Sequence, residues 1–394
     1  MILTYRYRLL PTKRQHLALQ SILESQRQLY NAALEERIDA YRKAGVTRTC
    51  IDQTKALTEW RQSDPEARTL PVTLQRATIK RLDEAYNAFF RRTKKKNGGK
   101  AGFPRFRGKG WFDSFGFREF FGIRLNAGRV RFKGMPAALR IHMHRPMPVE
   151  AVIKGCTFRR GVKGWSISFV ADVPSMPIRK GQRVVGVDLG ITPFAMLSNG
   201  EVVPSLRAAR RAERRLRLAQ RTLARAKRGS TGRRKARVTV ARCHADTGRR
   251  RANHLHQASA RLVRDYDVIA IEDLNVKGLA RSALAKDVHD ASWAKFISML
   301  RYKAERAGAR VVEVDPQNTT QDCSGCGVKV PKKLGERSHD CPCCGLSIDR
   351  DLNAARNILH PAGVGPGLRN VADSGMRAGG NLCSSSGPRQ ETPG

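Results

Sequence analysis

Residues 183–190 read Arg-Val-Val-Gly-Val-Asp-Leu-Gly, an apolar run that ends in an acid and a glycine. This pattern predicts a buried strand with Asp188 near its carboxyl end. Residues 267–273 read Asp-Val-Ile-Ala-Ile-Glu-Asp and predict a second buried strand, which ends at Glu272. A short helix is expected to begin with Asp351. Three separate elements therefore each present a carboxylate at one end.

The predicted elements from residue 183 onward follow the order strand, hairpin, strand, helix, strand, helix, strand, helix. This is the order of a ribonuclease H-like α/β domain, so we expect such a domain over residues 183–360. In that topology the first and fourth strands end side by side, and the last helix brings a third side chain to the same place. Asp188, Glu272 and Asp351 are therefore expected to meet.

Three neighbouring carboxylates repel one another, so stability alone does not explain such a cluster. Carboxylates suit hard divalent cations, which prefer oxygen ligands. Two magnesium ions about 4 Å apart can activate water and stabilise the leaving oxygen of a phosphodiester. The sequence therefore predicts a magnesium-dependent nuclease site on Asp188, Glu272 and Asp351.

Neighbouring acids leave two of these assignments open. The alternation of a strand puts Glu272 and Asp273 on opposite faces, so only one of them can point into the site. Asp349 could cap the helix that Asp351 begins.

Five of the nine cysteines fall within one stretch of 22 residues, from Cys323 to Cys344. Four of them form two Cys-x-x-Cys pairs separated by 14 residues: Cys323, Cys326, Cys341 and Cys344. This spacing is typical of four thiolates that hold a tetrahedral zinc ion, with Cys343 as a spare. A closed four-cysteine site is structural, so we expect zinc to support a ribbon over about 318–348 and to take no part in catalysis.

The charge of the chain indicates its partners. Lys and Arg number 75 against 34 Asp and Glu, a formal net charge of +41, and the basic residues run through every segment. Such a surface favours nucleic acid, whose phosphates bind Lys and Arg. No apolar run approaches the ~20 residues that span a bilayer, and the first residues lack the apolar core of a signal peptide. We expect a cytoplasmic protein with no membrane partner.

The first 175 residues predict a separate region. A strand at 5–10 precedes helices within about 12–93, and period-two alternation follows within 128–174. We expect a small β-barrel with the helices inserted into it or packed beside it. No helix-turn-helix or zinc finger is recognisable there.

Two further stretches differ in composition from the rest. Residues 103–107 read Phe-Pro-Arg-Phe-Arg, which is either a surface turn with anchoring aromatics or a nucleic-acid surface that combines charge with stacking. Residues 361–394 are rich in Gly, Ser and Pro, and we expect them to form a disordered tail.

Four motifs taken together resemble the OrfB/TnpB family, whose members are encoded by bacterial insertion sequences. They are Gly-Val-Asp-Leu-Gly at 186–190, Ile-Glu-Asp-Leu-Asn-Val at 271–276, Cys-Ser-Gly-Cys-Gly at 323–327 and Asp-Arg-Asp-Leu-Asn-Ala-Ala-Arg-Asn at 349–357. The family is similar to the RuvC-containing effectors of type V CRISPR systems. The resemblance covers nearly the whole chain.

The resemblance implies a role for each motif residue. The family's catalytic acids fall on Asp188, Glu272 and Asp351, which favours the last two over Asp273 and Asp349. The zinc ligands fall on the four paired cysteines. The implied fold is a split RuvC (ribonuclease H-like) domain with a zinc ribbon inserted before its last helix, preceded by an N-terminal wedge and recognition region.

The resemblance also implies an activity, that of an RNA-guided DNA endonuclease. The implied partners are a guide RNA from the protein's own transposable element and a double-stranded DNA target, which would associate the protein with the bacterial nucleoid. Two other functions stay open: a transposase that itself joins DNA ends, because one fold can host several chemistries, and a non-cutting RNA-guided DNA-binding regulator. The motifs do not indicate an oligomeric state.

Overall fold

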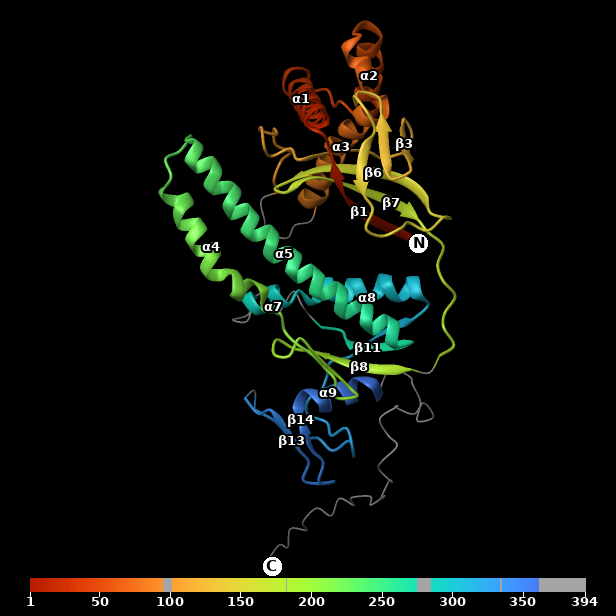
Figure 1. Cartoon of the computed structure of the whole chain (residues 1–394), viewed down its shortest axis with the longest axis vertical. Coiled ribbons are helices and arrows are strands. Elements are labelled where there is room, and N and C mark those ends of the chain that lie inside the picture. Colours follow the sequence, from red (N-terminus) through yellow and green to blue (C-terminus); the bar gives the residue numbers. More distant parts are fainter. Residues whose placement is uncertain (95–100, 182, 275–284, 334, 361–394) are drawn as a thin grey trace, which may run out of the picture. The chain divides into compact units, whose positions relative to one another are not determined.

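The computed structural model of the chain describes residues 1–94, 101–181, 183–274, 285–333 and 335–360. Two compact units make up the chain, Met1–Pro174 and Ser175–Gly394 (Figure 1). Residues 361–394, for which the sequence predicts a disordered tail, lie outside the described residues. No helix among the described residues is long and apolar enough to cross a membrane.

The N-terminal unit is built on one antiparallel sheet of seven strands in the order β2-β6-β7-β1-β5-β4-β3. The strands are β1 (Ile2–Leu10), β2 (Ser114–Phe117), β3 (Ile123–Asn126), β4 (Arg129–Phe132), β5 (Leu139–His142), β6 (Val152–Gly161) and β7 (Gly164–Asp172). Along β1, Leu3, Tyr5, Tyr7 and Leu9 are buried while the residues between them are exposed, as the alternation in the sequence predicts.

The predicted β-barrel is an open sheet. No hydrogen-bonded pairing joins the edge strands β2 and β3 in the described residues, so hydrogen bonds do not close the sheet into a barrel. Alternation along a strand indicates which side chains face the core, but it does not indicate whether two edge strands pair. The sequence therefore could not distinguish an open sheet from a closed one.

The predicted helical insertion lies between β1 and β2. It consists of α1 (Lys13–Ala44), α2 (Cys50–Ser63), the 3₁₀ turn η1 (Glu66–Thr69) and α3 (Val72–Lys94). Helix α1 begins at the predicted capping box, in which Thr12 and Gln15 exchange side-chain-to-backbone hydrogen bonds. No apolar stripe in the sequence indicates helix α2, because this helix buries only Gln53 and Leu57.

The second unit contains a five-stranded sheet in the order β10-β9-β8-β11-β12. Its strands are β8 (Val184–Leu189), β9 (Ala195–Leu197), β10 (Val202–Val203), β11 (Val268–Glu272) and β12 (Arg310–Val314). Strands β8, β11 and β12 run parallel, and the β9–β10 hairpin joins the edge antiparallel. The first and fourth strands thus lie side by side, which confirms the predicted strand arrangement.

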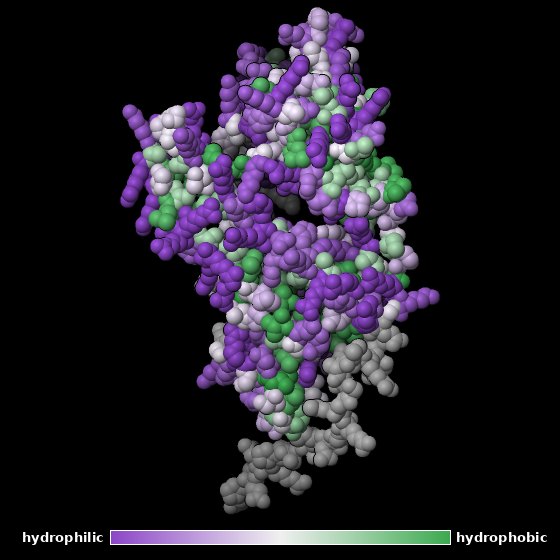
Figure 2. All heavy atoms as spheres, viewed as in Figure 1, coloured by the Kyte–Doolittle hydropathy of each residue, from purple (hydrophilic) through white to green (hydrophobic). Residues whose placement is uncertain are grey.

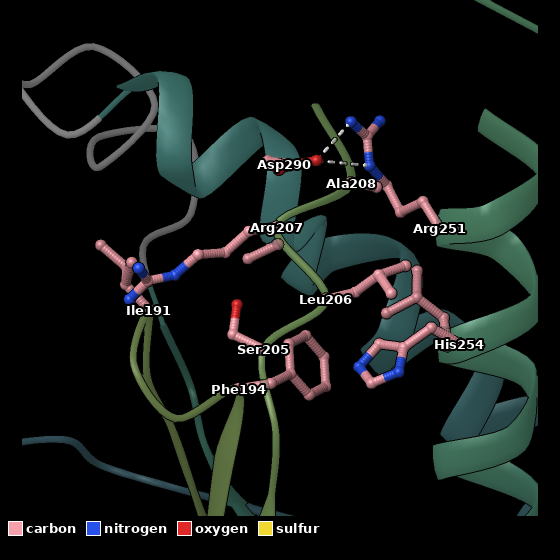
Figure 3. Close-up of a pocket in the computed structure, with 11 residues that line it drawn as sticks. Ile191, Phe194, Ser205, Leu206, Arg207, Ala208, Arg251, His254 and Asp290 are labelled. Atoms are coloured by element: carbon pink, nitrogen blue, oxygen red, sulfur yellow. Dashed lines mark hydrogen bonds and ion pairs between the residues drawn. The ribbon is translucent and has the colours of Figure 1, made fainter. Parts of the chain in front are cut away.

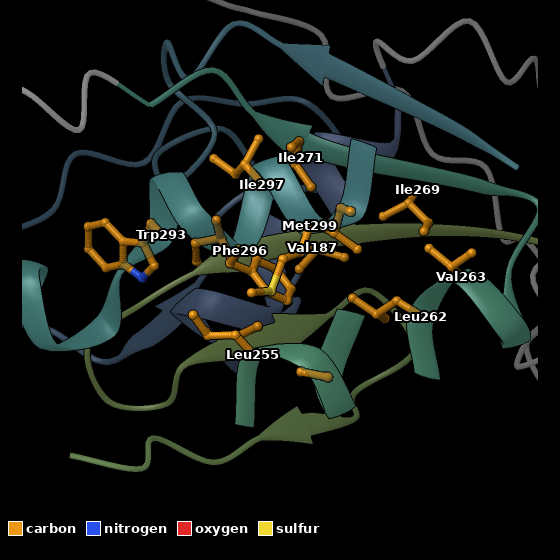
Figure 4. Close-up of a cluster of buried hydrophobic side chains, with 14 of the residues drawn as sticks. Val187, Leu255, Leu262, Val263, Ile269, Ile271, Trp293, Phe296, Ile297 and Met299 are labelled. Atoms are coloured by element: carbon orange, nitrogen blue, oxygen red, sulfur yellow. The ribbon is translucent and has the colours of Figure 1, made fainter. Parts of the chain in front are cut away.

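Helices cover both faces of this sheet. Helices α5 (Thr231–Asp265) and α8 (Trp293–Ala307) cover one face and α9 (Arg350–Leu359) covers the other, and the unit also contains α4 (Ala208–Arg225) and α7 (Ala285–Ala291). Figure 4 shows side chains of α5 and α8 packed against Val187, Ile269 and Ile271 of the central strands. Ala270 and Ile358 belong to a second cluster, with α9 on the opposite face. The alternate residues of β8 and β11 therefore face α9.

An arginine-rich hairpin of helices extends from the second unit. Helix α4 carries seven arginines and one glutamate, and it packs along the first part of α5 (Figure 1). Hydrophilic side chains predominate on this hairpin, with apolar ones among them, on the face that Figure 2 shows. An excess of arginine over acids on a helix pair favours contact with phosphates rather than a salt-bridged surface.

Candidate functional site

The two strand-borne acids lie at neighbouring strand ends. Strands β8 and β11 pair in register up to Val187 opposite Ile271, so Asp188 and Glu272 are the next residues of the two strands. Both alternate with residues of the α5 and α8 core, and both therefore face α9. Asp273 is exposed, as expected for the residue on the other side of the strand.

A glycine allows α9 to bring the third acid to this edge. A Cβ atom built on Gly186 would lie 2.0 Å from the carbonyl oxygen of Ala355 in α9, a distance that no side chain tolerates. Helix α9 therefore packs directly on the backbone of β8. Asp351 stands in the first turn of this helix and is buried.

The three acids influence one another's charge. Burial, together with the negative charges of Glu272 and Asp351, raises the pKa of Asp188 to about 8, and the Arg350 guanidinium opposes this rise. Burial also raises the pKa of Glu272, against a hydrogen bond from Thr319 that lowers it. Mutual repulsion of this kind is relieved by a bound cation.

Asp349 and Asp351, two residues apart, have different hydrogen-bond partners. Asp349 caps α9, because its Oδ1 accepts hydrogen bonds from the backbone N–H of Asp351 at 2.8 Å and of Leu352 at 3.2 Å. Asp351 is held instead by two guanidinium groups, at 3.1 Å from Arg350 and 3.4 Å from Arg337. Asp349 is therefore the cap of α9, and Asp351 is the acid that lies near Asp188.

The four predicted zinc cysteines lie together in the ribbon that contains β13 (Ser338–Asp340) and β14 (Ser347–Asp349). Their Sγ atoms all lie within 4.8 Å of one another. Of the described residues, this is the one group of three or more Cys, His, Asp or Glu side chains gathered so tightly, so the three carboxylates are spaced more widely. Cys343 is not part of the cluster.

The distances within the cysteine cluster fit zinc. Two Sγ···Sγ pairs, Cys323 with Cys344 and Cys326 with Cys341, are 3.6 Å and 3.5 Å apart. Zinc–sulfur bonds of about 2.3 Å would put tetrahedral sulfurs about 3.8 Å apart. The residues present therefore suit the ion that their spacing predicts.

Both knuckles have the same backbone. In the first, the N–H of Gly327 donates to the carbonyl of Cys323 at 2.8 Å, and in the second the N–H of Gly345 donates to that of Cys341 at 3.0 Å. The two glycines have φ of 77° and 72°, a conformation that glycine adopts without strain. These glycines close the tight turn after each cysteine pair.

Loss of one cysteine tests the ligand set. We expect one zinc per chain in the wild type and in Cys343→Ser, and a loss of zinc with a lower melting temperature in Cys323→Ser, because the ribbon has no other ion to hold it. Elemental analysis and thermal melting measure both. Equal zinc in Cys323→Ser and wild type would contradict the assignment, and loss of zinc in Cys343→Ser would change the ligand set.

A small cavity near the start of α4 lies apart from these groups. Figure 3 shows Phe194, His254 and the Arg251–Asp290 ion pair around it, and none of the acids of the cluster lines it. Its volume of about 20 Å³ suits a single water molecule rather than a substrate. The cavity is a packing feature of the unit.

The exposed face of the N-terminal sheet carries arginines directly opposite one another. Arg124 of β3 pairs with Arg131 of β4, and Arg129 of β4 pairs with Arg140 of β5. All four are exposed, and no acid of the described residues forms an ion pair with them. Like charges opposite each other destabilise a sheet, so this arginine face favours a polyanionic ligand.

The Phe-Pro-Arg-Phe-Arg stretch is an anchored turn, as the first of its two interpretations predicts. Asn31 binds the backbone of Arg107 twice, accepting from its N–H at 2.8 Å and donating to its carbonyl at 3.1 Å. Phe103 packs edge-on against Tyr86, at 5.4 Å between ring centroids. Phe106 remains 55% exposed. The stretch is an anchored surface turn that also presents an aromatic ring to solvent.

The sequence did not predict the polar residues near the three carboxylates. Thr319 contacts Glu272, and Asn353 and Asn357 of α9 bind the turn that contains Thr319. Two of them stand inside the motif at 349–357, but their partners are backbone groups of a distant turn. Only the position of that motif pointed to them.

Three protein-family models match the chain. One described as a probable transposase (OrfB, IS605) matches residues 168–283, and one described as a Cas12f1-like TNB domain matches 293–358. The third, described as a helix-turn-helix domain, matches residues 1–45. The sequence alone showed no such motif, and the structure there has strand β1 and the single long helix α1.

Two curated proteins are similar over nearly the full length. A "Putative RNA-guided DNA endonuclease" of Streptomyces pristinaespiralis is 33% identical over 384 residues, which cover 94% of this chain and 92% of that protein. The "Putative RNA-guided DNA endonuclease InsQ" of Escherichia coli K12 is 24% identical over 375 residues, 90% of this chain and 91% of that protein.

A solved structure has a similar fold. The protein in a Cas12f1–sgRNA–target DNA complex matches with a TM-score of 0.54 at 13% identity, over 89% of this chain and 83% of that one. The family models, the full-length relatives and this fold agree with the motifs quoted above. The chain belongs to the OrfB/TnpB family.

Proposed function

We propose that this protein is a transposon-encoded, RNA-guided DNA endonuclease with a split RuvC (ribonuclease H-like) nuclease domain into which a zinc ribbon is inserted. The observation that carries the proposal is the meeting of Asp188, Glu272 and Asp351, from two strand ends and one helix start, in a member of the OrfB/TnpB family. Stability does not account for three mutually repelling acids, of which Glu272 and Asp351 are buried and Asp188 is half-buried, whereas phosphodiester hydrolysis does.

The three carboxylates would hold magnesium. Their oxygen atoms are the ligands this cation prefers, and a bound pair of such ions activates water and stabilises the leaving oxygen of a phosphodiester. Asp188 and Glu272 are fixed by the sheet and Asp351 by the first turn of α9. The guanidinium groups beside Asp351 neutralise part of its charge and would share it with the cation. The zinc of the ribbon would be structural.

A guide RNA would select the DNA target. Relatives over nearly the full length are named as RNA-guided DNA endonucleases. The arginine face of the N-terminal sheet and the α4–α5 hairpin offer many cations for phosphates. Contacts to phosphate carry no sequence information, so a guide RNA transcribed from the protein's own element would supply specificity by base pairing. DNA binding would place the protein on the nucleoid.

The experiment that tests the activity starts from the RNA that copurifies with the protein. That RNA is sequenced, and a DNA duplex complementary to its guide segment is incubated with the complex in magnesium or in EDTA. We expect cleavage only in magnesium. Binding of the duplex without cleavage in any divalent metal would favour the non-cutting regulator instead.

The arginine face makes a separate prediction about RNA binding. We expect Arg124→Ala/Arg131→Ala to weaken binding of the copurifying RNA and to lower the slope of log K against log salt by about 1 for each phosphate that the variant no longer binds. The melting temperature should not fall, because the change removes a repulsive pair. Filter binding over a series of salt concentrations measures the affinity and the slope, and thermal melting measures the stability.

The matched control is Arg124→Lys/Arg131→Lys, which keeps the charge and should keep the slope. An unchanged slope in the alanine variant would show that the arginine face does not bind this RNA.

A further inference from the structure

The turn that joins β12 to the zinc ribbon contains a buried hydroxyl group next to one of the proposed catalytic acids. The Oγ1 of Thr319 donates to Glu272 Oε1 at 2.5 Å, and both residues are 7% exposed. A second acceptor, the carbonyl of Pro316, is more distant at 3.2 Å. The shorter bond ends on a charged group, and charge-assisted bonds are the stronger ones.

This hydrogen bond engages one oxygen of the Glu272 carboxylate, Oε1, and does not involve Oε2. No described residue donates a hydrogen bond to Glu272 Oε2. A glutamate side chain rotates about its last carbon–carbon bond with little preference. Fixing Oε1 therefore sets the direction in which Oε2 is presented to the site.

Two asparagines of α9 hold the same turn in place. Asn357 Nδ2 donates to the carbonyls of Thr319 at 2.8 Å and Asp322 at 2.6 Å. Asn353, which is fully buried, donates to the carbonyl of Asp322 at 2.8 Å and accepts from the N–H of Ser324 at 2.9 Å. Helix α9, which carries Asp351, is thus hydrogen-bonded to the turn whose Thr319 donates to Glu272.

The same hydrogen bonds reach the first zinc knuckle. Ser324 stands between the ligands Cys323 and Cys326, and its backbone N–H is the one bound by Asn353. The base of the ribbon, the start of α9 and the β11 carboxylate are therefore joined by one series of hydrogen bonds. Such outer interactions orient the groups that bind a metal.

We propose that Thr319 is a positioning residue for Glu272, through which the anchored base of the zinc ribbon fixes the direction of that carboxylate for the divalent cation. This inference rests on the proposed function, because it takes Glu272 to be a ligand of the cation. The turn at the base of the ribbon would thus orient a ligand of the catalytic cation, while the zinc itself would have only a structural role.

The test compares Thr319→Val, Thr319→Ser and the matched control Thr320→Val in the full-length, zinc-loaded protein. Valine keeps the shape of threonine without the hydroxyl, serine keeps the hydroxyl, and Thr320 is the exposed neighbour. Binding of manganese is measured by calorimetry without RNA, with Asp188→Ala as the baseline for sites elsewhere. Cleavage by the RNA complex is then measured over a range of magnesium concentrations.

We expect Thr319→Val to bind manganese about 10- to 100-fold more weakly and to need correspondingly more magnesium, which is the usual effect of removing a hydrogen bond that orients a metal ligand. Thr319→Ser and Thr320→Val should behave as the wild type, and zinc content should be equal in all. Wild-type manganese affinity in Thr319→Val, or an equal loss in Thr319→Ser, would overturn the proposal.

Two precautions keep the test decisive. If Thr319→Val has a lower zinc content or melting temperature, Thr319→Ala, which introduces no new bulk, replaces it under the same criteria. Because manganese binding is read without RNA or DNA, a wild type that binds manganese but cuts nothing would count against the proposed function alone. A normal manganese titration in the valine variant would count against Thr319 alone.

Discussion

Asp188→Asn is expected to abolish DNA cleavage while leaving nucleic-acid binding intact. The carboxylate stands near the end of β8, where the charges of Glu272 and Asp351 act on it, and asparagine cannot supply the negative oxygen that a divalent cation needs. Removing a group that only orients a metal ligand costs about 10- to 100-fold, so loss of a direct ligand should exceed 100-fold. Nicking and binding assays in magnesium measure the two activities separately.

The same substitution should make the metal-free protein more stable. Burial and two neighbouring acids raise the pKa of Asp188 to about 8, which means that the folded protein holds its ionised form at a cost. Asparagine removes that cost. A higher melting temperature in EDTA, together with lost cleavage, would separate a functional acid from a structural one.

Glu272→Gln and Asp351→Asn should also lose cleavage, and two neighbours serve as controls. Asp273→Ala should retain it, because this side chain is exposed. Asp349→Ala should lose stability by about 1 kcal/mol as a helix cap does and keep measurable cleavage. Full activity in any of the three cluster variants would remove that residue from the site, and the reverse ranking would mean that the neighbours are the ligands.

The carboxylates could be predicted from sequence because each stands at the end of a strongly patterned element. Asp188 and Glu272 close two runs of aliphatic residues that are too apolar for anything but central strands. Asp351 opens a helix whose cap, Asp349, stands two residues earlier. Strand order then brings these ends together, but the pattern alone left Asp273 and Asp349 as alternatives, and only the family resemblance favoured Glu272 and Asp351. The cysteine cluster needed only its spacing.

The features that sequence missed depend on interactions between distant elements. Gly186 appeared as one more residue of an apolar strand, and its need for glycine comes from the carbonyl of Ala355 in α9. The opposed pair Arg124 and Arg131 follows from the register of two four-residue strands, which no pattern specifies. Thr319 is a lone hydroxyl residue in a turn, and nothing along the chain connects it with a strand end 47 residues earlier.

Cleavage at a defined site is expected to require the RNA partner. The net charge of +41 is spread over both units, and phosphate contacts of this kind bind any sequence. Over residues 1–45, where one family model is described as a helix-turn-helix domain, the structure has a strand and one helix rather than two helices joined by a turn. The described residues therefore offer no second helix there to read a major groove.

The experiment follows one DNA target and its cut position. It compares protein stripped of RNA at high salt, protein with its cognate RNA, and protein with a guide segment of altered sequence. We expect no specific cut in the first case, a cut at the matching site in the second, and a cut that moves to the newly matching site in the third, because base pairing selects the target. A cut at the same site by RNA-free protein, or a cut that stays in place when the guide changes, would make a transposase that acts directly on DNA the better account. The Asp188→Asn complex is the control for contaminating nucleases, since it should bind each guide-matched target and cut none of them.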